Sequence, residues 1–217
     1  MLTITNEDNM QLMARYPDKY FDLAIVDPPY GIGASKRKGS TKNGKYLCGF
    51  DEDTRYKISN WDNETPKKEY FEELFRISKN QIVWGGNYFE LPISRGWIFW
   101  DKVTPVPNYS DGELAWTSFD KVLKKIKIHW MGKLRTGIER DYKCIHPTQK
   151  PIKLYKFLLE KYANQGDKIL DTHLGSGSIA IACHDYGFDL TACELDKEYY
   201  DKAMQRIKEH DSQQKLF

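Results

Sequence analysis

Short apolar runs alternate along the chain with segments whose apolar residues recur at helical spacing. Residues 22–26 are almost wholly apolar, which is typical of a central parallel strand buried on both faces. The segment after Thr65-Pro66 has a helical apolar face, with Thr65 as the expected N-cap. This alternation predicts an α/β fold with a mostly parallel sheet. Further strands are expected at 2–5, 81–84, 96–100, 168–170 and 190–193, and further helices after Pro151 and up to Gly187.

Two neighbouring segments favour an antiparallel hairpin at one edge of that sheet. Residues 114–117 and 126–130 flank a short polar stretch, and the second segment alternates polar and apolar residues. We therefore expect the two to pair with each other.

The length and charge of the chain limit its organisation. Its 217 residues suffice for one substantial core, so we expect a single catalytic domain, residues 1–217. A net charge of +2 is too small to attract polyanions over the whole surface. The scattered cysteines Cys48, Cys144, Cys183 and Cys193 favour neither a metal site nor a disulfide framework. No long apolar run is present, and we expect a cytoplasmic protein without a membrane segment.

A glycine-rich loop follows the strand at 168–170. Gly175-Ser176-Gly177 opens a helix, and Glu194 ends the next strand. Glycines let a nucleotide approach the backbone, and the acid can accept hydrogen bonds from two ribose hydroxyls. Ala180 replaces the third glycine of the dinucleotide fingerprint, so S-adenosylmethionine fits this loop better than NAD.

A more specific motif, Asp27-Pro28-Pro29-Tyr30, ends the buried strand at 22–26. The amino group of a nucleobase is a weak nucleophile, because its lone pair is delocalised into the ring. A carboxylate from Asp27 and the carbonyl of Pro28 would accept its two N–H bonds, while Pro29 stiffens the turn. Tyr30 offers a ring on which an extruded base can stack. The motif predicts methyl transfer to a flipped base.

These motifs resemble those of the DNA amino-methyltransferases, whose hallmark is Asp, Asn or Ser followed by Pro-Pro and an aromatic residue. The order, with the catalytic motif before the glycine loop, resembles the circularly permuted beta class. The resemblance implies a Rossmann-like methyltransferase fold with a seven-stranded sheet. The segment His146-Pro147-Thr148-Gln149-Lys150-Pro151 matches the family motif beside the methionine part of the cofactor, and Asp8 matches its adenine contact. The implied cofactor residues are Asp8, Asp27, His146, Thr148, Lys150, Asp171, His173, Gly175, Ser176, Gly177 and Glu194.

The chain departs from the family pattern in two places. Asp171-Thr172-His173 stands where the family usually has Asp-Pro-Phe, and Ser178 replaces a common threonine. The segment for target recognition, residues 102–145, is also short, which implies loose sequence specificity or help from a second subunit.

The target base and the activity leave alternatives open. Asp27 favours adenine N6, whereas serine more often opens the motif of enzymes that methylate cytosine N4. Protein glutamine methyltransferases carry the two motifs in the opposite order. An inactive DNA-binding relic is the third alternative, although every catalytic position is filled.

Two surface features predict partners. A polar loop, residues 31–65, follows the catalytic motif, and we expect it to contact the phosphates of double-stranded DNA. The terminal Gln213, Leu216 and Phe217 resemble the peptide by which bacterial repair proteins dock on the sliding clamp, and a homodimer is a further expectation. The expected phosphate contacts are Lys36, Arg37, Lys38, Lys42, Lys45, Lys125 and Lys127.

Overall fold

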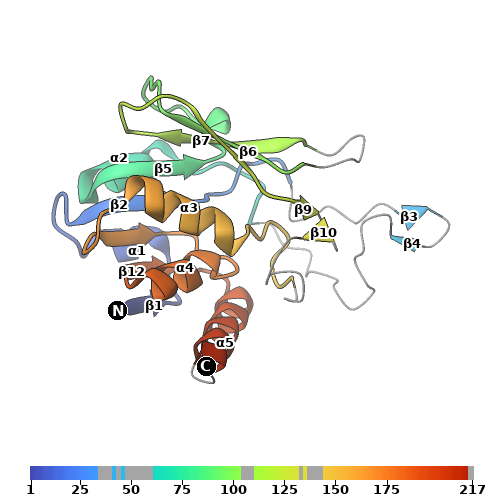
Figure 1. Ribbon diagram of the computed structural model, residues 1–217. Helices are drawn as coiled ribbons and strands as arrows, with labels where there is room; N and C mark the ends of the chain where they lie inside the picture. The colour runs from blue at the N-terminus through green and yellow to red at the C-terminus, as the bar shows by residue number, and fades with distance from the viewer. Residues whose placement is uncertain are drawn as a thin grey trace.

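The computed structural model describes residues 1–33, 41–42, 45–46, 61–103, 110–131, 134–135 and 144–214, with the backbone alone at 41–42, 45–46, 131, 134–135 and 213–214. An eight-stranded sheet runs through the centre in the order β1-β12-β11-β2-β5-β7-β6-β8 (Figure 1). Its strands are β1 (Leu2–Thr5), β2 (Phe21–Val26), β5 (Ser78–Trp84), β6 (Trp97–Asp101), β7 (Gly112–Thr117), β8 (Lys124–Lys127), β11 (Lys168–Asp171) and β12 (Asp189–Cys193). Two small pairs, β3 (Thr41–Lys42) with β4 (Lys45–Tyr46) and β9 (Trp130–Met131) with β10 (Leu134–Arg135), lie apart from it.

Helices cover both faces of this sheet. They are α1 (Asn9–Met13), α2 (Lys68–Ile77), α3 (Ile152–Tyr162), α4 (Ser178–Tyr186) and α5 (Lys197–Gln214), with a 3-10 turn at Gly86–Tyr88. Figure 1 shows α3 and α4 side by side on the same face.

The residues of β2 alternate between the two cores. Leu23 and Ile25 pack into the cluster that contains α3 and α4, whereas Ala24 and Val26 pack into the cluster that contains α1 and α2. Every second residue of a strand faces the same side, so a strand between two helical layers must be apolar throughout. The run at 22–26 is thus apolar because its strand is buried on both faces, as predicted.

The parallel part of the sheet brings three strand ends together. β11 pairs in parallel with β2 on one side and with β12 on the other. The residues at and just after their carboxyl ends, Asp27, Asp171 and Glu194, therefore lie along one edge. This is the edge at which open α/β sheets bind ligands.

The predicted hairpin is wrong. β7 pairs antiparallel with β5 and with β6, and β8 pairs in parallel with β6. The second half of β7 is buried and needs a neighbour on each side, whereas β8 is mostly exposed and forms an edge. The antiparallel element is therefore an internal strand. The sheet has one strand more than the seven expected, and the mostly parallel α/β class is confirmed.

Other local expectations have mixed outcomes. α2 begins at Lys68 with Lys67 as its N-cap, so the prediction of Thr65 as the cap is wrong. α4 ends at Gly187 as expected, with a left-handed backbone at φ 72°. Cys183 and Cys193 are free thiols, the Cys144 thiol donates to the carbonyl of His146 at 3.6 Å, and Cys48 lies outside the described residues. No helix in the described ranges has the length and apolar character that crossing a membrane would require.

Candidate active site

A cavity of about 920 Å³ opens at the carboxyl edge of the sheet. It is lined by the start of α1, Asp27 and Pro29 of the catalytic motif, the segment before α3, the glycine loop and the residues after β12. The catalytic and cofactor motifs, far apart in sequence, thus face one space. The expected site residues that line it are Asp8, Asp27, Pro29, His146, Thr148, Lys150, His173, Gly175, Ser176 and Glu194.

Asp27 stands at the end of β2 with both carboxylate oxygens in contact with side chains. The Tyr30 hydroxyl donates to Oδ1 at 2.6 Å, and the Lys150 ammonium donates to Oδ2 at 2.5 Å. Burial raises the pKa of Asp27, while the charge of Lys150 opposes that rise. Burial also holds the pKa of Tyr30 well above its ordinary value, so the phenol stays a neutral donor.

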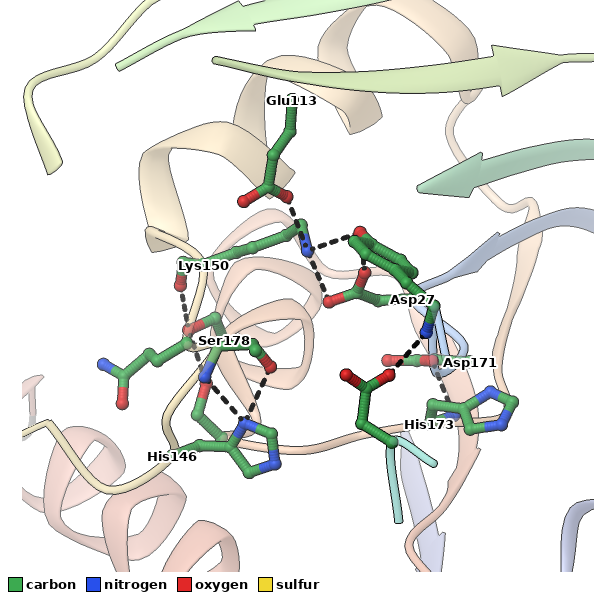
Figure 2. Close-up of polar contacts among 12 residues, drawn as sticks. Asp27, Glu113, His146, Lys150, Asp171, His173 and Ser178 are labelled. Carbon is green, nitrogen blue, oxygen red and sulfur yellow. Dashed lines mark hydrogen bonds and ion pairs between the residues drawn. The ribbon is translucent and has the colours of Figure 1, made fainter. Parts of the chain in front are cut away.

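Lys150 lies between two carboxylates (Figure 2). Its Nζ is 3.1 Å from Oε2 of Glu113, and Lys102 donates to Oε1 of the same glutamate at 2.5 Å. Burial lowers the pKa of Lys150, but Asp27 and Glu113 outweigh it and hold that pKa above its ordinary value. Burial raises the pKa of Glu113, but Lys150 and Lys102 bring it down to about 2. Two ammonium groups, Lys150 and Lys102, thus face two carboxyl groups, Asp27 and Glu113.

Tyr30 is fixed by its surroundings. Oδ1 of Asp62 accepts from the backbone N–H of Tyr30 at 2.7 Å and of Gly31 at 3.0 Å. The ring of Tyr88 stacks on Tyr30 at a centroid distance of 5.0 Å and an angle of 13°. Gly85 has φ 67°, and a Cβ there would lie 2.2 Å from the Tyr30 ring. Only glycine leaves room for this ring.

Glu194 is held by backbone donors. The N–H of Gly175 donates to Oε2 at 2.8 Å, and the N–H of Asp196 donates to Oε1 at 2.9 Å. Burial raises the pKa of Glu194, and these N–H groups oppose the rise. A carboxylate has lone pairs beyond those two bonds, so Glu194 can still accept from a ligand.

His173 belongs to a chain of polar contacts that runs into the core. Its Nε2 lies 3.0 Å from Asn9 Nδ2, and its Nδ1 lies 2.9 Å from Thr172 Oγ1. Thr172 Oγ1 lies 2.7 Å from the Tyr70 hydroxyl. Burial lowers the pKa of His173 to about 3, so the ring is neutral at physiological pH. Asn9 is a donor, so the proton of this ring is on Nδ1.

The ring of His146 lies beside Gly175 of the glycine loop. Thr148 contacts its Nδ1 through the backbone N–H at 3.4 Å and through Oγ1 at 3.1 Å. Its ring packs edge-on against Tyr199. Burial, assisted by the charge of Lys150, lowers the pKa of His146 to about 3. Like His173, it is a neutral hydrogen-bonding group.

Of the remaining expected site residues, some line the cavity and others lie behind its lining. Asp8 caps α1 by accepting from the N–H groups of Met10 and Gln11, and its side chain lines the cavity. Pro28 and Asp171 are buried behind the lining, with Asp171 accepting from the His173 N–H. Gly177 is the N-cap of α4 at φ 72°.

The predicted DNA contacts and tail are only partly described. Lys125 and Lys127 lie on the edge strand β8, and Lys125 forms an ion pair with Asp101 at 2.9 Å. The tail is described only as far as the backbone of Gln214, the last residue of α5. Lys36, Arg37, Lys38, Leu216 and Phe217, with the side chains of Lys42 and Lys45, lie outside the described residues.

Three positions in this site were not anticipated from the sequence. Glu113 and Asp62 carry no motif around them, and only the folded chain brings Glu113 to Lys150 and Asp62 to Tyr30. The double glycine that begins at Gly85 comes directly after a predicted strand, and this signal marks a close backbone approach.

Comparison with known proteins assigns the chain to a family. A family model described as DNA methylase matches residues 99–205. The type II methyltransferase M.HpaI of Haemophilus parainfluenzae is 36% identical over 221 residues, covering 86% of this chain and 68% of that protein. M2.DpnII of Streptococcus pneumoniae, also a type II methyltransferase, is 23% identical, covering 95% and 89%.

Solved structures share the fold. The M1.HpyAVI complex with S-adenosylmethionine has a TM-score of 0.57 at 20% identity, covering 95% of this chain and 99% of that chain. The PvuII DNA methyltransferase, described as cytosine-N4-specific, also has a TM-score of 0.57, at 14% identity, covering 96% and 92%. With one cavity that joins the Asp27 motif to the glycine loop, and with these matches, the chain belongs to the DNA methylase family.

Proposed function

We propose that this protein transfers the methyl group of S-adenosylmethionine to the exocyclic amino nitrogen of a flipped base in double-stranded DNA, with adenine N6 as the target. The observation that carries the proposal is the shared cavity, which places Asp27 and Glu194 in one space. The type II methyltransferase relatives support membership of a restriction-modification system.

The lining of the cavity suits this cofactor. S-adenosylmethionine, when bound, supplies a methyl group on a positively charged sulfonium. Carboxylates outnumber ammonium groups around the cavity, which favours a cationic ligand. The acidic lining residues are Glu7, Asp8, Asp27, Glu64, Glu69, Glu194 and Asp196, and the basic ones are Lys67 and Lys150.

The chain's own residues take separate roles toward base and cofactor. Asp27 and the Pro28 carbonyl accept the N–H bonds of the amino group, and Asp27 stabilises the positive charge that develops on nitrogen. Tyr30, backed by Tyr88, offers its ring to the base. Glu194 accepts from the ribose hydroxyls. The other cofactor contacts we propose are Asp8, His146, Thr148, His173, Gly175 and Ser176.

Methyl transfer to unmethylated plasmid DNA tests the proposal. We expect tritium from labelled S-adenosylmethionine to appear in N6-methyladenine after nucleoside analysis. Asp27→Ala should abolish turnover and leave the calorimetric affinity for the cofactor nearly unchanged. Label in N4-methylcytosine would instead support the second candidate, which the fold shared with PvuII methyltransferase favours. An Asp27→Ala variant with more than a few per cent of wild-type activity would overturn the catalytic assignment.

Contacts with DNA phosphates are the second part of the proposal. We assign them to the loop 31–65 and to Lys125 and Lys127 on β8, within the recognition segment 102–145. Affinity for DNA should then fall steeply with salt. Charge reversal at Lys36, Arg37 and Lys38 should flatten that dependence, and an unaltered slope would exclude the loop.

The finer partner assignments concern location and assembly. We propose a cytoplasmic protein whose Gln213, Leu216 and Phe217 dock on a bacterial sliding clamp, with a homodimer as the alternative source of additional DNA contacts. Deleting residues 213–217 should abolish clamp binding and leave activity on short oligonucleotides intact. Sedimentation analysis of the free protein tests the dimer.

A further inference from the structure

The ammonium group of Lys150 occupies the hydrogen-bonding position that the target amino group needs. It donates to Oδ2 of Asp27 and lies 3.3 Å from the Tyr30 hydroxyl, which itself donates to Oδ1. The side chain of Lys150 is only 3% exposed. A base amino group that enters this site meets a carboxylate whose oxygens already accept hydrogen bonds (Figure 2).

The charge of Lys150 also opposes the reaction at this position. Methyl transfer places positive charge on the amino nitrogen, and a cation beside the same carboxylate raises the energy of that state. The contact between Lys150 and Asp27 must therefore weaken before the methyl group is transferred.

Glu113 offers the alternative position. Its Oε2 is buried and already lies 3.1 Å from Lys150 Nζ, and no other hydrogen-bond partner reaches it among the described residues. Its other oxygen is fixed by Lys102. Since Glu113 has a pKa of about 2, it remains a carboxylate at physiological pH.

The backbone limits the motion to the end of the lysine side chain. The Ser178 hydroxyl donates to the carbonyl of Lys150 at 2.7 Å, and the next residue, Pro151, is the N-cap of α3. Rotation about the terminal bonds is then enough to exchange one carboxylate for the other.

We propose that Lys150 is an exchangeable placeholder, which contacts both Asp27 and Glu113 while no base is bound and gives up Asp27 to pair with Glu113 alone when the target amino group enters. This inference rests on the proposed methyltransferase function. Lys150 and Glu113 are positioning residues, since they act through Asp27. The exchange keeps the buried carboxylate paired before DNA arrives and leaves it free to accept N–H bonds afterwards.

A double-mutant cycle tests the exchange. Glu113→Gln removes the second position, so Lys150 should stay on Asp27 and lower the single-turnover rate on unmethylated plasmid DNA by about 10-fold or more. Lys150→Met removes the competitor, so the double variant should be faster than Glu113→Gln alone. Lys161→Met, an exposed lysine on α3, is the matched control. If the methionine variant does not fold, Lys150→Gln replaces it.

Two readouts separate positioning from a structural role. The acid limb of the pH–rate profile should move up by about one pH unit in Lys150→Met, because Asp27 loses the charge that lowers its pKa. It should move down in Glu113→Gln, because Glu113 raises the same pKa. Affinity for S-adenosylmethionine by calorimetry should not change in Glu113→Gln, since Glu113 does not line the cavity.

The outcomes distinguish the two proposals. A wild-type protein that does not methylate unmethylated DNA overturns the proposed function. If the wild type is active, two results would overturn the placeholder alone. The first is a double variant no faster than Glu113→Gln, and the second is a pair of acid limbs that do not move in opposite directions.

Discussion

Asp27 and Glu194 end two strands of the same sheet, separated only by β11, yet they are held in different ways. The partners of Asp27 are the side chains of Tyr30 and Lys150, whereas those of Glu194 are backbone N–H groups. Side chains rotate in place, but backbone donors move only with the chain. The comparison teaches that the base end of the cavity has exchangeable partners and that the cofactor end is preformed.

Among the variants that test this comparison, the largest effect should come from closing the space around Tyr30. In Gly85→Ala the new Cβ would overlap the ring, so the ring must shift and turnover should fall about 100-fold. Single-turnover methylation measures this. Gly166→Ala is the matched control outside the cavity, since Gly166 also has a left-handed backbone, at φ 91°, and its Cβ would meet no atom within 4 Å. It should show only the left-handed strain of about 1–2 kcal/mol. Equal losses of turnover in the two variants would show that the backbone strain, and not the Tyr30 ring, causes the loss.

Removing the carboxylate at the cofactor end should affect binding rather than chemistry. Glu194→Ala loses hydrogen bonds to the ribose hydroxyls. The binding of S-adenosylmethionine, measured by calorimetry, should weaken by about 2–4 kcal/mol. Glu194→Gln, which keeps one acceptor, should lose less. An affinity unchanged in both variants would remove Glu194 from the cofactor site.

Asp62 offers another test of the base end, because its carboxylate accepts hydrogen bonds from backbone N–H groups there. Asp62→Ala leaves the N–H groups of Tyr30 and Gly31 without this acceptor and should cost about 1–3 kcal/mol of unfolding free energy. Thermal unfolding should show a midpoint roughly 3–10 °C lower. Asp62→Asn retains a carbonyl oxygen and should recover part of the loss. A midpoint within error of the wild type would show that the contact is not stabilising.

The pH dependence of stability should report Asp171, which ends the strand between the other two. Burial raises its pKa from 3.8 to about 8, so between these values the folded state binds a proton that the unfolded state releases. The contribution of Asp171 to the free energy of unfolding therefore falls as pH rises toward 8, by at most about 1.4 kcal/mol per pH unit. Asp171→Asn should flatten the decline of the unfolding midpoint from pH 6 to 9. Asp120→Asn, at an exposed carboxylate, should not.

Local signals predicted what depends on local chemistry. The apolar run before Asp27 and the glycines before α4 identified two strand ends and their loops. Turn geometry and burial depend mainly on residues that are adjacent in the sequence. The wrong hairpin shows the limit. β7 and β8 follow each other in sequence, but β6 lies between them in the sheet, and a periodicity pattern does not record which strand is a neighbour.

The site shows the same limit at the level of single side chains. Lys150 was identified through the motif that surrounds it and was expected near the methionine end of the cofactor. Its partners Asp27 and Glu113 come from other strands, and only the fold brings the three together. Long-range ion pairs of this kind leave no spacing signal in one sequence.

The pairing of β1 with β12 has a consequence for the order of folding. The N-terminal ammonium group contacts Asp189 across 188 residues, and the short segment after β1 supplies Asp8 and Asn9 to the cavity. Contacts between such distant residues form slowly, because a long loop must close first. On the ribosome, β1 therefore waits for β12, which is synthesised much later. The cofactor pocket closes only after β12 has been synthesised, so the ability to bind cofactor is gained late.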